Sequence, residues 1–361
     1  MTQEITNSAR KRVLSGMRPT GKLHLGNYMG ALKNWVGLQH QYECYFFIAD
    51  YHALTTDYAD TSALKQNVAD VVLDFLAAGL DPTLCTIFRQ SRVPAHFALN
   101  DLLAMITPLS WLERVPTYKD QQEQLREKDL ATYGFLGYPL LQSADILLYQ
   151  PEFVPVGQDQ AAHVEITREI ARRFNHLYGA KRTAMLAAKS DKERLAELEQ
   201  EEDVRQILPE PKVLLTPSPK LPGTDGRKMS KSYGNTILLS DPEPELRAKL
   251  KTMVTDPARV RRTDPGNPDI CPVFDLHKVF SPPEVQANAA EGCRTAGIGC
   301  IQCKTWVADA IVAELAPIQE RRKHFEANPA EVAAILDDGA QRANARAAVT
   351  MQQVNAAVGL E

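Results

Sequence analysis

The sequence lacks several features that would place the protein in common functional classes. It has no apolar run near the roughly 20 residues that a membrane-spanning helix needs, and its N-terminus carries no apolar stretch of the signal-peptide type. Basic residues do not dominate, because 41 Lys and Arg stand against 45 Asp and Glu, giving a net charge of −4. Any contact with RNA must therefore use local patches rather than a global charge attraction.

Two common nucleotide-binding signatures are also missing, since the sequence has neither a Walker A loop nor a GxGxxG motif. Only six cysteines occur in 361 residues, and without a signal segment they favour a reducing cytoplasm over a disulfide framework. The hydrophobic content of 44% is ordinary for a globular chain with a sizeable core. We expect one large or two medium domains.

What the sequence does contain is a glycine-rich turn between a strand pattern and a helix pattern. Residues 12–14 read as the end of a buried strand, and the apolar spacing over 27–39 predicts a helix. Such a turn, leading into a helix N-terminus, favours bound anions because free backbone N–H groups point the same way. His24 and Asn27 lie at this turn and can donate hydrogen bonds to phosphate oxygens. Alone, the turn is a weak signal.

A second polar segment follows some two hundred residues later, at residues 226–235. It carries Lys228 and Lys231 with two serines, and glycines at 223, 226 and 234 give it freedom to move. Taken alone, such a segment is usually just an exposed basic loop.

Strand and helix patterns alternate through the first hundred residues. Residues 43–50 form an apolar run typical of a strand buried on both faces, 61–78 follow a helical period, and 85–89 form another strand. This alternation predicts a doubly wound parallel sheet, with ligands at the carboxyl ends of its strands. Four polar or small residues fall at those ends: Gly16, Asp50, His52 and Gln90.

One carboxylate interrupts the apolar helix predicted over 138–149. Asp145 stands among leucines, where a charge is costly unless it is hydrogen-bonded. It either lies on an exposed face, bonds a backbone N–H, or accepts a hydrogen bond in a ligand pocket. Residues 153–160 then read as a strand breaking into a helix over 160–178, with Asp159 as a candidate cap. On that helix, Glu165 and Arg168 are spaced to pair with each other.

The remainder of the chain reads as helical. We expect a solvated helical insertion over about 181–212, a turn-rich hinge before the lysine loop, and helices over 243–254, 304–327, 329–337 and 339–358. Four cysteines cluster here, with 21, 6 and 2 residues between them: Cys271, Cys293, Cys300 and Cys303. They are reduced bystanders, ligands of a structural Zn²⁺, or ligands of an iron–sulfur cluster. The single Cys-x-x-Cys pair weakens the zinc alternative.

Together the two polar segments are specific. Leu23-His-Leu-Gly-Asn27 and Lys228-Met-Ser-Lys-Ser232 resemble the two signatures of class I aminoacyl-tRNA synthetases. The longer pattern over 15–32 is similar to the tryptophanyl-tRNA synthetase family, and the resemblance runs over nearly the whole chain. Asn27 stands where the wider class has a second histidine, and the tryptophan family commonly has Asn there. Gln142 departs from relatives that carry an apolar residue.

The resemblance implies ATP-dependent activation of tryptophan and its transfer to tRNA(Trp), with Mg²⁺ bound through the phosphates. His24, Asn27, Lys228 and Lys231 would be catalytic. The ATP site would comprise Arg18, Pro19, Thr20, Gly26, Asn27, Gly157, Gln158, Asp159, Lys228, Met229, Ser230, Lys231 and Ser232. Around tryptophan would lie Asp145, which accepts the indole N–H, together with Gly16, His52, Tyr138, Gln142, Val154, Val156 and Gln160.

The resemblance also implies domains and partners. A Rossmann-like catalytic domain would span 1–235, with the lysine loop at 226–235, and an α-helical anticodon-binding domain would span 236–361. The enzyme would be a cytoplasmic homodimer. A subgroup of the family holds a [4Fe-4S] cluster on four cysteines of nearly this spacing. Arginines at 259, 261 and 262, and the basic run 321–324, are candidate tRNA contacts or solvated helix faces.

Three alternatives remain. A tyrosine-activating enzyme would share the fold and the reaction, although Asp145 and the valines suit an indole better than a phenol. A non-charging RNA- or nucleotide-binding paralogue would not need both lysines. An iron–sulfur redox module would leave the ATP motifs unexplained.

Overall fold

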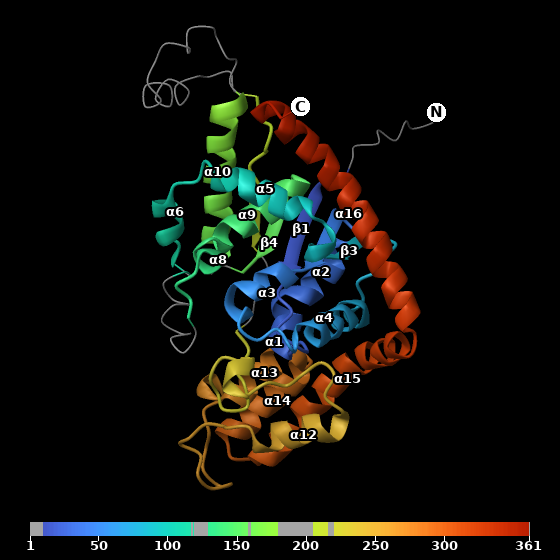
Figure 1. Cartoon of the computed structure of the whole chain (residues 1–361). Helices are drawn as coiled ribbons and strands as arrows, with labels where there is room; N and C mark the ends of the chain where they lie inside the picture. The colour runs from blue at the N-terminus through green and yellow to red at the C-terminus, as the bar shows by residue number, and fades with distance from the viewer. Residues whose placement is uncertain are drawn as a thin grey trace, which may run out of the picture.

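The computed structural model describes residues 10–116, 118, 129–157, 160–179, 205–215 and 220–360. Its centre is a sheet of five parallel strands in the order β3-β2-β1-β4-β5 (Figure 1). The strands are β1 (Arg12–Met17), β2 (Glu43–Ile48), β3 (Cys85–Arg89), β4 (Phe153–Val156) and β5 (Lys212–Leu215). The chain builds from β1 to one edge and then returns to the other side of β1. This is the doubly wound, Rossmann-like sheet that the sequence predicts.

The central strands are buried on both faces because helices cover both sides of the sheet. In β1, Val13 packs in one hydrophobic core and Leu14 in the other, since successive side chains of a strand point to opposite faces. Phe46 and Phe47 of β2 divide in the same way. The continuous apolar run over 43–48 therefore reflects two cores rather than one.

The helices around the sheet follow the predicted pattern with shifted ends. They are α1 (Leu25–Asn27), a π-helical turn (Tyr28–Leu32), α2 (Lys33–Leu38), α3 (Asp50–Asp57), α4 (Leu64–Ala78), α5 (Ala95–Ala104), α6 (Leu109–Glu113), α8 (Tyr133–Leu136), α9 (Tyr138–Tyr149) and α10 (Ala161–Gly179). The helix predicted over 27–39 begins two residues earlier, at Leu25. It passes through the π-helical turn, a feature that often marks functional sites.

After the lysine loop the described chain is helical. It forms α12 (Glu243–Thr252), α13 (Pro272–Phe280), α14 (Pro283–Arg294), α15 (Cys300–Ala327) and α16 (Pro329–Val358). The first three gather with the start of α15 below the sheet, whereas α16 runs back beside it and contacts β3, α9 and α5 (Figure 1). The expected division at residue 235 groups α16 with the helical domain, although α16 packs mainly on β3 and on helices that cover the sheet.

The break predicted between helices 329–337 and 339–358 is wrong, because α16 is continuous through Gly339. A Cβ atom at Gly339 would lie 1.8 Å from the carbonyl oxygen of Ile87 on β3. This glycine therefore lets the helix approach the strand backbone closely instead of ending the helix.

Strand β5 was not predicted. Most of the expected helical insertion over 181–212 lies outside the described residues, but Lys212, its last residue, opens β5. Four residues are too few to display the alternation that identifies a strand. Pairing with β4, with Phe153 opposite Lys212, supplies what the local sequence does not.

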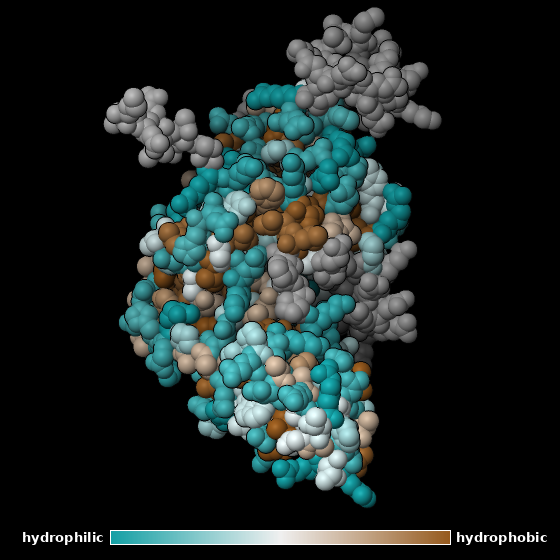
Figure 2. Space-filling view, turned by 180° about the vertical axis from the view of Figure 1, so that it is seen from behind, coloured by the Kyte–Doolittle hydropathy of each residue, from teal (hydrophilic) through white to brown (hydrophobic). Residues whose placement is uncertain are grey.

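The surface seen from behind is mostly hydrophilic, and apolar side chains gather above the centre of the view (Figure 2). Within the described ranges, no helix is both long and apolar enough to cross a membrane.

Candidate active site

Two adjoining cavities lie near the carboxyl ends of β1 and β2, at the switch point of the sheet. The inner pocket, of about 380 Å³, lies between β1, α9 and β4, and the outer pocket, of about 710 Å³, lies between the glycine-rich turn and the lysine loop. The turn after β1 borders both, with Arg18 on the inner pocket and Pro19 on the outer. Helix α3 also borders both pockets, with His52 on the inner pocket and Ala53 on the outer pocket. A ligand crossing this turn would occupy both cavities.

All eight residues expected around tryptophan line the inner pocket. They are Gly16, His52, Tyr138, Gln142, Asp145, Val154, Val156 and Gln160. A Cβ atom at Gly16 would lie 2.4 Å from the Phe47 ring, so a side chain there would force that buried ring to move. The volume falls within the range of small-molecule sites.

Asp145 is the polar centre of the inner pocket. It is 1% exposed, so its location on an exposed helix face is ruled out. His96 Nδ1 lies 2.6 Å and Gln90 Nε2 2.7 Å from Oδ1, and His52 Nε2 lies 2.8 Å from Oδ2. Its partners are therefore side chains from α3, α5 and the segment after β3, not a backbone N–H.

These contacts fix the charge state of the carboxyl group. Burial alone would raise the pKa of Asp145, but His96 and His52 hold it below its usual value, so the group is an ionised acceptor. Two donors occupy Oδ1 and one occupies Oδ2. Since a carboxylate oxygen can accept two hydrogen bonds, Oδ2 retains capacity for a donor from a ligand.

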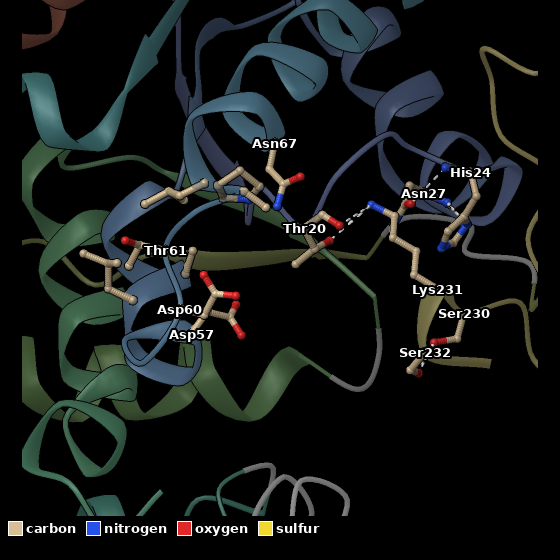
Figure 3. A pocket seen from close by; sticks show the side chains of 15 residues that line it. Thr20, His24, Asn27, Asp57, Asp60, Thr61, Asn67, Ser230, Lys231 and Ser232 are labelled. Atoms are coloured by element: carbon tan, nitrogen blue, oxygen red, sulfur yellow. Dashed lines mark hydrogen bonds between the residues drawn. The ribbon is translucent and has the colours of Figure 1, made fainter. Parts of the chain in front are cut away.

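The outer pocket brings the two sequence signatures together. The glycine-rich turn contributes Pro19, Thr20, His24 and Asn27, and the lysine loop contributes Ser230, Lys231 and Ser232. Figure 3 shows Lys231 reaching toward Thr20, with Asp57 and Asp60 away from it on the other side of Thr20. The cavity thus has a cationic, hydroxyl-rich end where phosphates can bind.

His24 and Asn27 cap each other at the start of α1. The Asn27 N–H donates to His24 Nδ1 at 3.3 Å, and the His24 N–H donates to Asn27 Oδ1 at 3.2 Å. Burial, with Lys231 and Lys228 nearby, lowers the pKa of His24 to about 4, so the ring is neutral at pH 7. Nε2 then carries the proton and is free of the cap, which makes it a hydrogen-bond donor.

Lys231 bonds to the opposite wall of the outer pocket. Its Nζ donates to the carbonyl oxygens of Gly21 at 2.7 Å and Thr20 at 3.0 Å, and lies 3.3 Å from Thr20 Oγ1. Burial lowers its pKa to about 8, against the opposing effect of Asp74 and Asp70. A phosphate entering this pocket would have to replace these carbonyl contacts.

The other residues expected at ATP lie elsewhere around the site. Arg18 and Gly157 line the inner pocket, Lys228 is exposed, and the Met229 side chain is buried in the core. Gly26 lies beside the His24 ring. Gln158 and Asp159 lie outside the described residues.

Sequence reasoning missed His96 and Tyr149, which complete the Asp145 network. His96 is fully buried, and its Nε2 lies 3.0 Å from the Tyr149 hydroxyl. Gln90 was placed at the sheet edge but given no role. The only local indication was that His96 is a polar residue in an otherwise apolar helix. The local sequence does not show that its partner is Asp145, 49 positions away.

The four clustered cysteines are near one another. Burial, together with the nearby thiols of Cys271, Cys293 and Cys300, raises the pKa of the Cys303 thiol to about 12. Arg259 Nη1 lies 3.7 Å from the Cys293 sulfur. In the part of the chain that the structure describes, no group of three or more His, Cys, Asp or Glu is placed to hold a metal ion.

Two of the basic residues considered for tRNA are internal, so that hypothesis is wrong for them. Arg259 is 9% exposed and donates to the carbonyl oxygens of Ile298 and Arg262. Arg322 is 5% exposed and pairs with Asp70 and Asp74 of α4. The predicted pair of Glu165 and Arg168 is confirmed at 3.0 Å.

Comparison with known proteins gives one consistent family. The protein-family model described as "tRNA synthetases class I (W and Y)" matches residues 6–316 of this chain. The chain is 50% identical to the tryptophan–tRNA ligase of Ralstonia nicotianae, covering 97% of this chain and 98% of that protein. It is 49% identical to that of Thermotoga maritima, covering 97% and 99%. A crystal structure of Campylobacter jejuni tryptophanyl-tRNA synthetase with ADP and tryptophan aligns with a TM-score of 0.81 and 33% identity, over 96% of this chain and 99% of that one.

Proposed function

The chain belongs to the class I tRNA synthetases of the tryptophan and tyrosine type, and from this premise we propose how its two pockets perform a tryptophan–tRNA ligase reaction. The enzyme activates L-tryptophan with ATP to tryptophanyl-adenylate and pyrophosphate. It then transfers tryptophan to the 3′ end of tRNA(Trp). The observation that carries the assignment of sites is that the inner and outer pockets adjoin at the turn after β1.

Tryptophan occupies the inner pocket. The indole ring lies between α9 and β4, and its N–H donates to Asp145 Oδ2, the carboxylate oxygen with a single protein donor. An ionised carboxylate is a strong acceptor, and a ligand without an N–H or O–H would leave its remaining lone pair unpaired in a buried site. The amino-acid carboxylate then faces the turn at Gly16 and Arg18.

ATP occupies the outer pocket, with its phosphates between the turn and the lysine loop. The tryptophan carboxylate attacks the α-phosphorus; the new carboxylate–phosphorus bond forms as the bond to pyrophosphate breaks. The protein contributes positioning and charge neutralisation rather than covalent chemistry. Lys231 and Lys228 neutralise the leaving pyrophosphate, while neutral His24 and Asn27 donate hydrogen bonds. The adenosine end of ATP extends to the inner pocket at Gly157, and Gly157, with Gln158 and Asp159, binds it. Mg²⁺ would arrive with the nucleotide and would supply further neutralisation of the phosphate charge.

Tryptophan-dependent ATP–pyrophosphate exchange tests this assignment. The full chain should exchange label with tryptophan and not with tyrosine, and should charge tRNA(Trp) in a second assay. Exchange that ran with tyrosine alone would overturn the substrate. Exchange without any charging of tRNA would support tryptophan activation but would refute the tRNA ligase activity.

The helical part from residue 236 is the anticodon-binding domain. Its exposed basic residues, among them Arg261 and Arg262, are the candidates for tRNA contacts, since Arg259 and Arg322 are internal. If these residues meet phosphates, tRNA affinity should fall steeply as salt rises. Substituting both with Gln should weaken tRNA binding and leave exchange unchanged.

The enzyme acts as a homodimer. Phe97 of α5, Met105 just after α5 and Leu109 of α6 are 45%, 73% and 60% exposed, and they form the apolar surface that a second copy could cover. Light scattering of the full chain should give twice the chain mass, and Leu109→Glu should shift it toward the monomer. A monomeric wild-type chain would overturn this assembly.

The four cysteines would hold a [4Fe-4S] cluster that would stabilise the helical domain, although the described side chains are not placed as a ready metal site. In favour of this fit, four thiols influence one another's pKa values, and two cations, Arg259 and Lys304, lie among them. Such cations would offset the negative charge of four thiolates. Binding must displace the thiol protons, so loading should release acid. The six free thiols also agree with a cytoplasmic location.

Metal analysis of protein purified without oxygen tests the cluster. About four irons and matching sulfide per chain support it. One zinc per chain would replace it with a structural zinc site, and no metal would return the cysteines to bystanders. Cys300→Ser should then change neither iron content nor charging.

A further inference from the structure

The backbone immediately before His24 is held by a carboxylate from another helix. The Leu23 N–H donates to Asp74 Oδ2 at 2.7 Å, and Asp74 lies on α4, fully buried. On its other side, the Leu23 carbonyl oxygen accepts the Leu239 N–H at 2.9 Å. Leu23, the residue before His24, is therefore fixed from two directions, and one of them is a hydrogen bond to a single ionisable side chain.

Asp74 depends in turn on Arg322 of α15. Arg322 is 5% exposed and pairs with Asp74 through Nη1, with Asp70 through Nη2 at 3.0 Å, and with Glu326 through Nε at 2.8 Å. Asp70 and Asp74 are four residues apart on one face of α4, which suits the fork of a guanidinium group. Burial raises the pKa of Asp74 to about 6, and Arg322 acts against that rise, keeping the carboxylate ionised at neutral pH.

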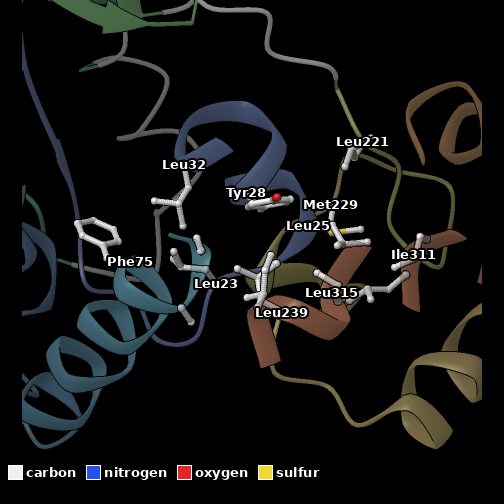
Figure 4. Packing of buried hydrophobic residues seen from close by; sticks show 14 of the residues in the cluster. Leu23, Leu25, Tyr28, Leu32, Phe75, Leu221, Met229, Leu239, Ile311 and Leu315 are labelled. Carbon is white, nitrogen blue, oxygen red and sulfur yellow. The ribbon is translucent and has the colours of Figure 1, made fainter. Parts of the chain in front are cut away.

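Apolar packing joins the same three parts of the chain. Leu23 and Leu25 of the glycine-rich turn, Met229 and Leu239 around the lysine loop, and Leu315 of α15 belong to one core cluster (Figure 4). The Leu25 N–H also donates to the Ile237 carbonyl oxygen at 3.0 Å. A shift of α15 against α4 would thus be felt at the turn that carries His24.

We propose that Arg322 is a positioning residue for the ATP pocket, which acts through Asp74 on the Leu23 backbone and so sets the position of His24 and Asn27. The helical domain thereby takes part in nucleotide binding without contacting the nucleotide. This inference rests on the proposed function of the outer pocket. The inner pocket has no link to Arg322 among its described contacts and should be unaffected.

The test compares two neighbouring arginines of the full chain. Arg321 also holds α15 to α4, by donating from Nε to the Ala77 carbonyl oxygen at 2.6 Å, but its described contacts do not include Asp74. Arg322→Gln should raise the KM for ATP in tryptophan-dependent exchange at least about tenfold, as expected when a buried ion pair loses one partner. It should leave the tryptophan Kd, measured by equilibrium dialysis without ATP, within about twofold, and Arg321→Gln should leave both constants unchanged.

Two outcomes would overturn the proposal: an unchanged KM for ATP in Arg322→Gln, or an equal loss of tryptophan affinity, which would mean general loosening of the fold. Arg322→Lys keeps one ion pair and should recover part of the ATP affinity. If Arg322→Gln fails to fold, the double variant Asp74→Leu/Arg322→Leu removes both charges of the Asp74–Arg322 pair, and its KM for ATP must still rise.

A different result would refute the proposed function: the wild-type chain would show no tryptophan-dependent ATP–pyrophosphate exchange. In that case, calorimetric titration of wild-type and Arg322→Gln protein with ATP alone still decides the positioning role, because equal ATP affinity in the two would refute it.

Discussion

The two pockets of this enzyme differ in how their polar groups are held. In the inner pocket, Asp145 is bonded by side chains from three other elements, and all of them are buried. In the outer pocket, Lys231 lies on a loop and reaches backbone carbonyls of Thr20 and Gly21 across the cavity. The first arrangement is complete before the ligand arrives, whereas the second must exchange its bonds when phosphates enter.

This difference matches what each ligand demands. Indole offers one N–H and a large flat apolar surface, so selectivity depends on a rigid acceptor at a fixed depth. A triphosphate is highly charged, and the catalytic need is for cations that close around it as charge develops on pyrophosphate. We therefore expect substitutions in the inner pocket to act on tryptophan and those in the outer pocket to act on ATP.

The largest effect should come from Asp145→Asn. The amide would place an NH₂ group against donors that now meet a carboxylate, and it removes the charged acceptor for indole. We expect kcat/KM for tryptophan to fall about a thousandfold. Losing a charged hydrogen bond and leaving its buried partners unpaired together cost more than about 4 kcal/mol of transition-state stabilisation. The KM for ATP should stay within about twofold.

Asp50→Asn is the matched control for this change. Asp50 is also buried and lies at the carboxyl end of β2, but its partners are Arg89 and Ser91, and it lines neither pocket. It should lower the thermal midpoint without changing the tryptophan KM. If both variants lose tryptophan affinity equally, the special role of Asp145 is refuted.

Lys231→Ala should act on the outer pocket, and therefore on ATP rather than on tryptophan. Without the ammonium group, charge on the leaving pyrophosphate is less well neutralised, and single-turnover adenylate formation should slow about a hundredfold. The tryptophan Kd should stay within about twofold. Lys323→Ala, which removes an exposed lysine paired with Glu320, is the control. An unchanged single-turnover rate would remove Lys231 from the chemistry.

The pH profile of kcat/KM for ATP should separate the pockets again. Because burial lowers the pKa of Lys231 to about 8, its positive charge is present below pH 8 and is lost as the pH rises through that value. The constant should then fall about tenfold per pH unit above 8. Lys231→Arg should abolish this fall, since arginine stays charged. The tryptophan Kd of the free enzyme should show no such step.

Tyr149→Phe should give the smallest effect. With Nδ1–H donating to Asp145, Nε2 of His96 accepts from the Tyr149 hydroxyl, and losing that hydroxyl leaves a buried acceptor without its partner. At about 1 kcal/mol this corresponds to a roughly fivefold rise in the tryptophan KM with little change in kcat. Tyr45→Phe is the control, because its ring lies against Tyr149 while its hydroxyl bonds Glu43. Equal effects of the two variants would remove His96 from indole recognition.

The sequence by itself determined four of the five strands, most helices and the two signatures, because these depend on local patterns. Strands 43–48 and 85–89 and helix α4 follow from apolar runs and helical spacing. The glycine-rich turn and the lysine loop are recognisable from a few consecutive residues each, and all eight residues expected around tryptophan line one cavity.

Tertiary structure alone decided what depends on distant partners. Gly339 looks like a helix break until the Ile87 backbone is seen against it, and β5 is too short to recognise without β4. His96 and Arg322 look like ordinary polar residues in helices, yet one meets Asp145 and the other meets Asp74, 49 and 248 positions away. Burial makes such pairs consequential, because a charge removed from water must find its partner wherever the fold places it.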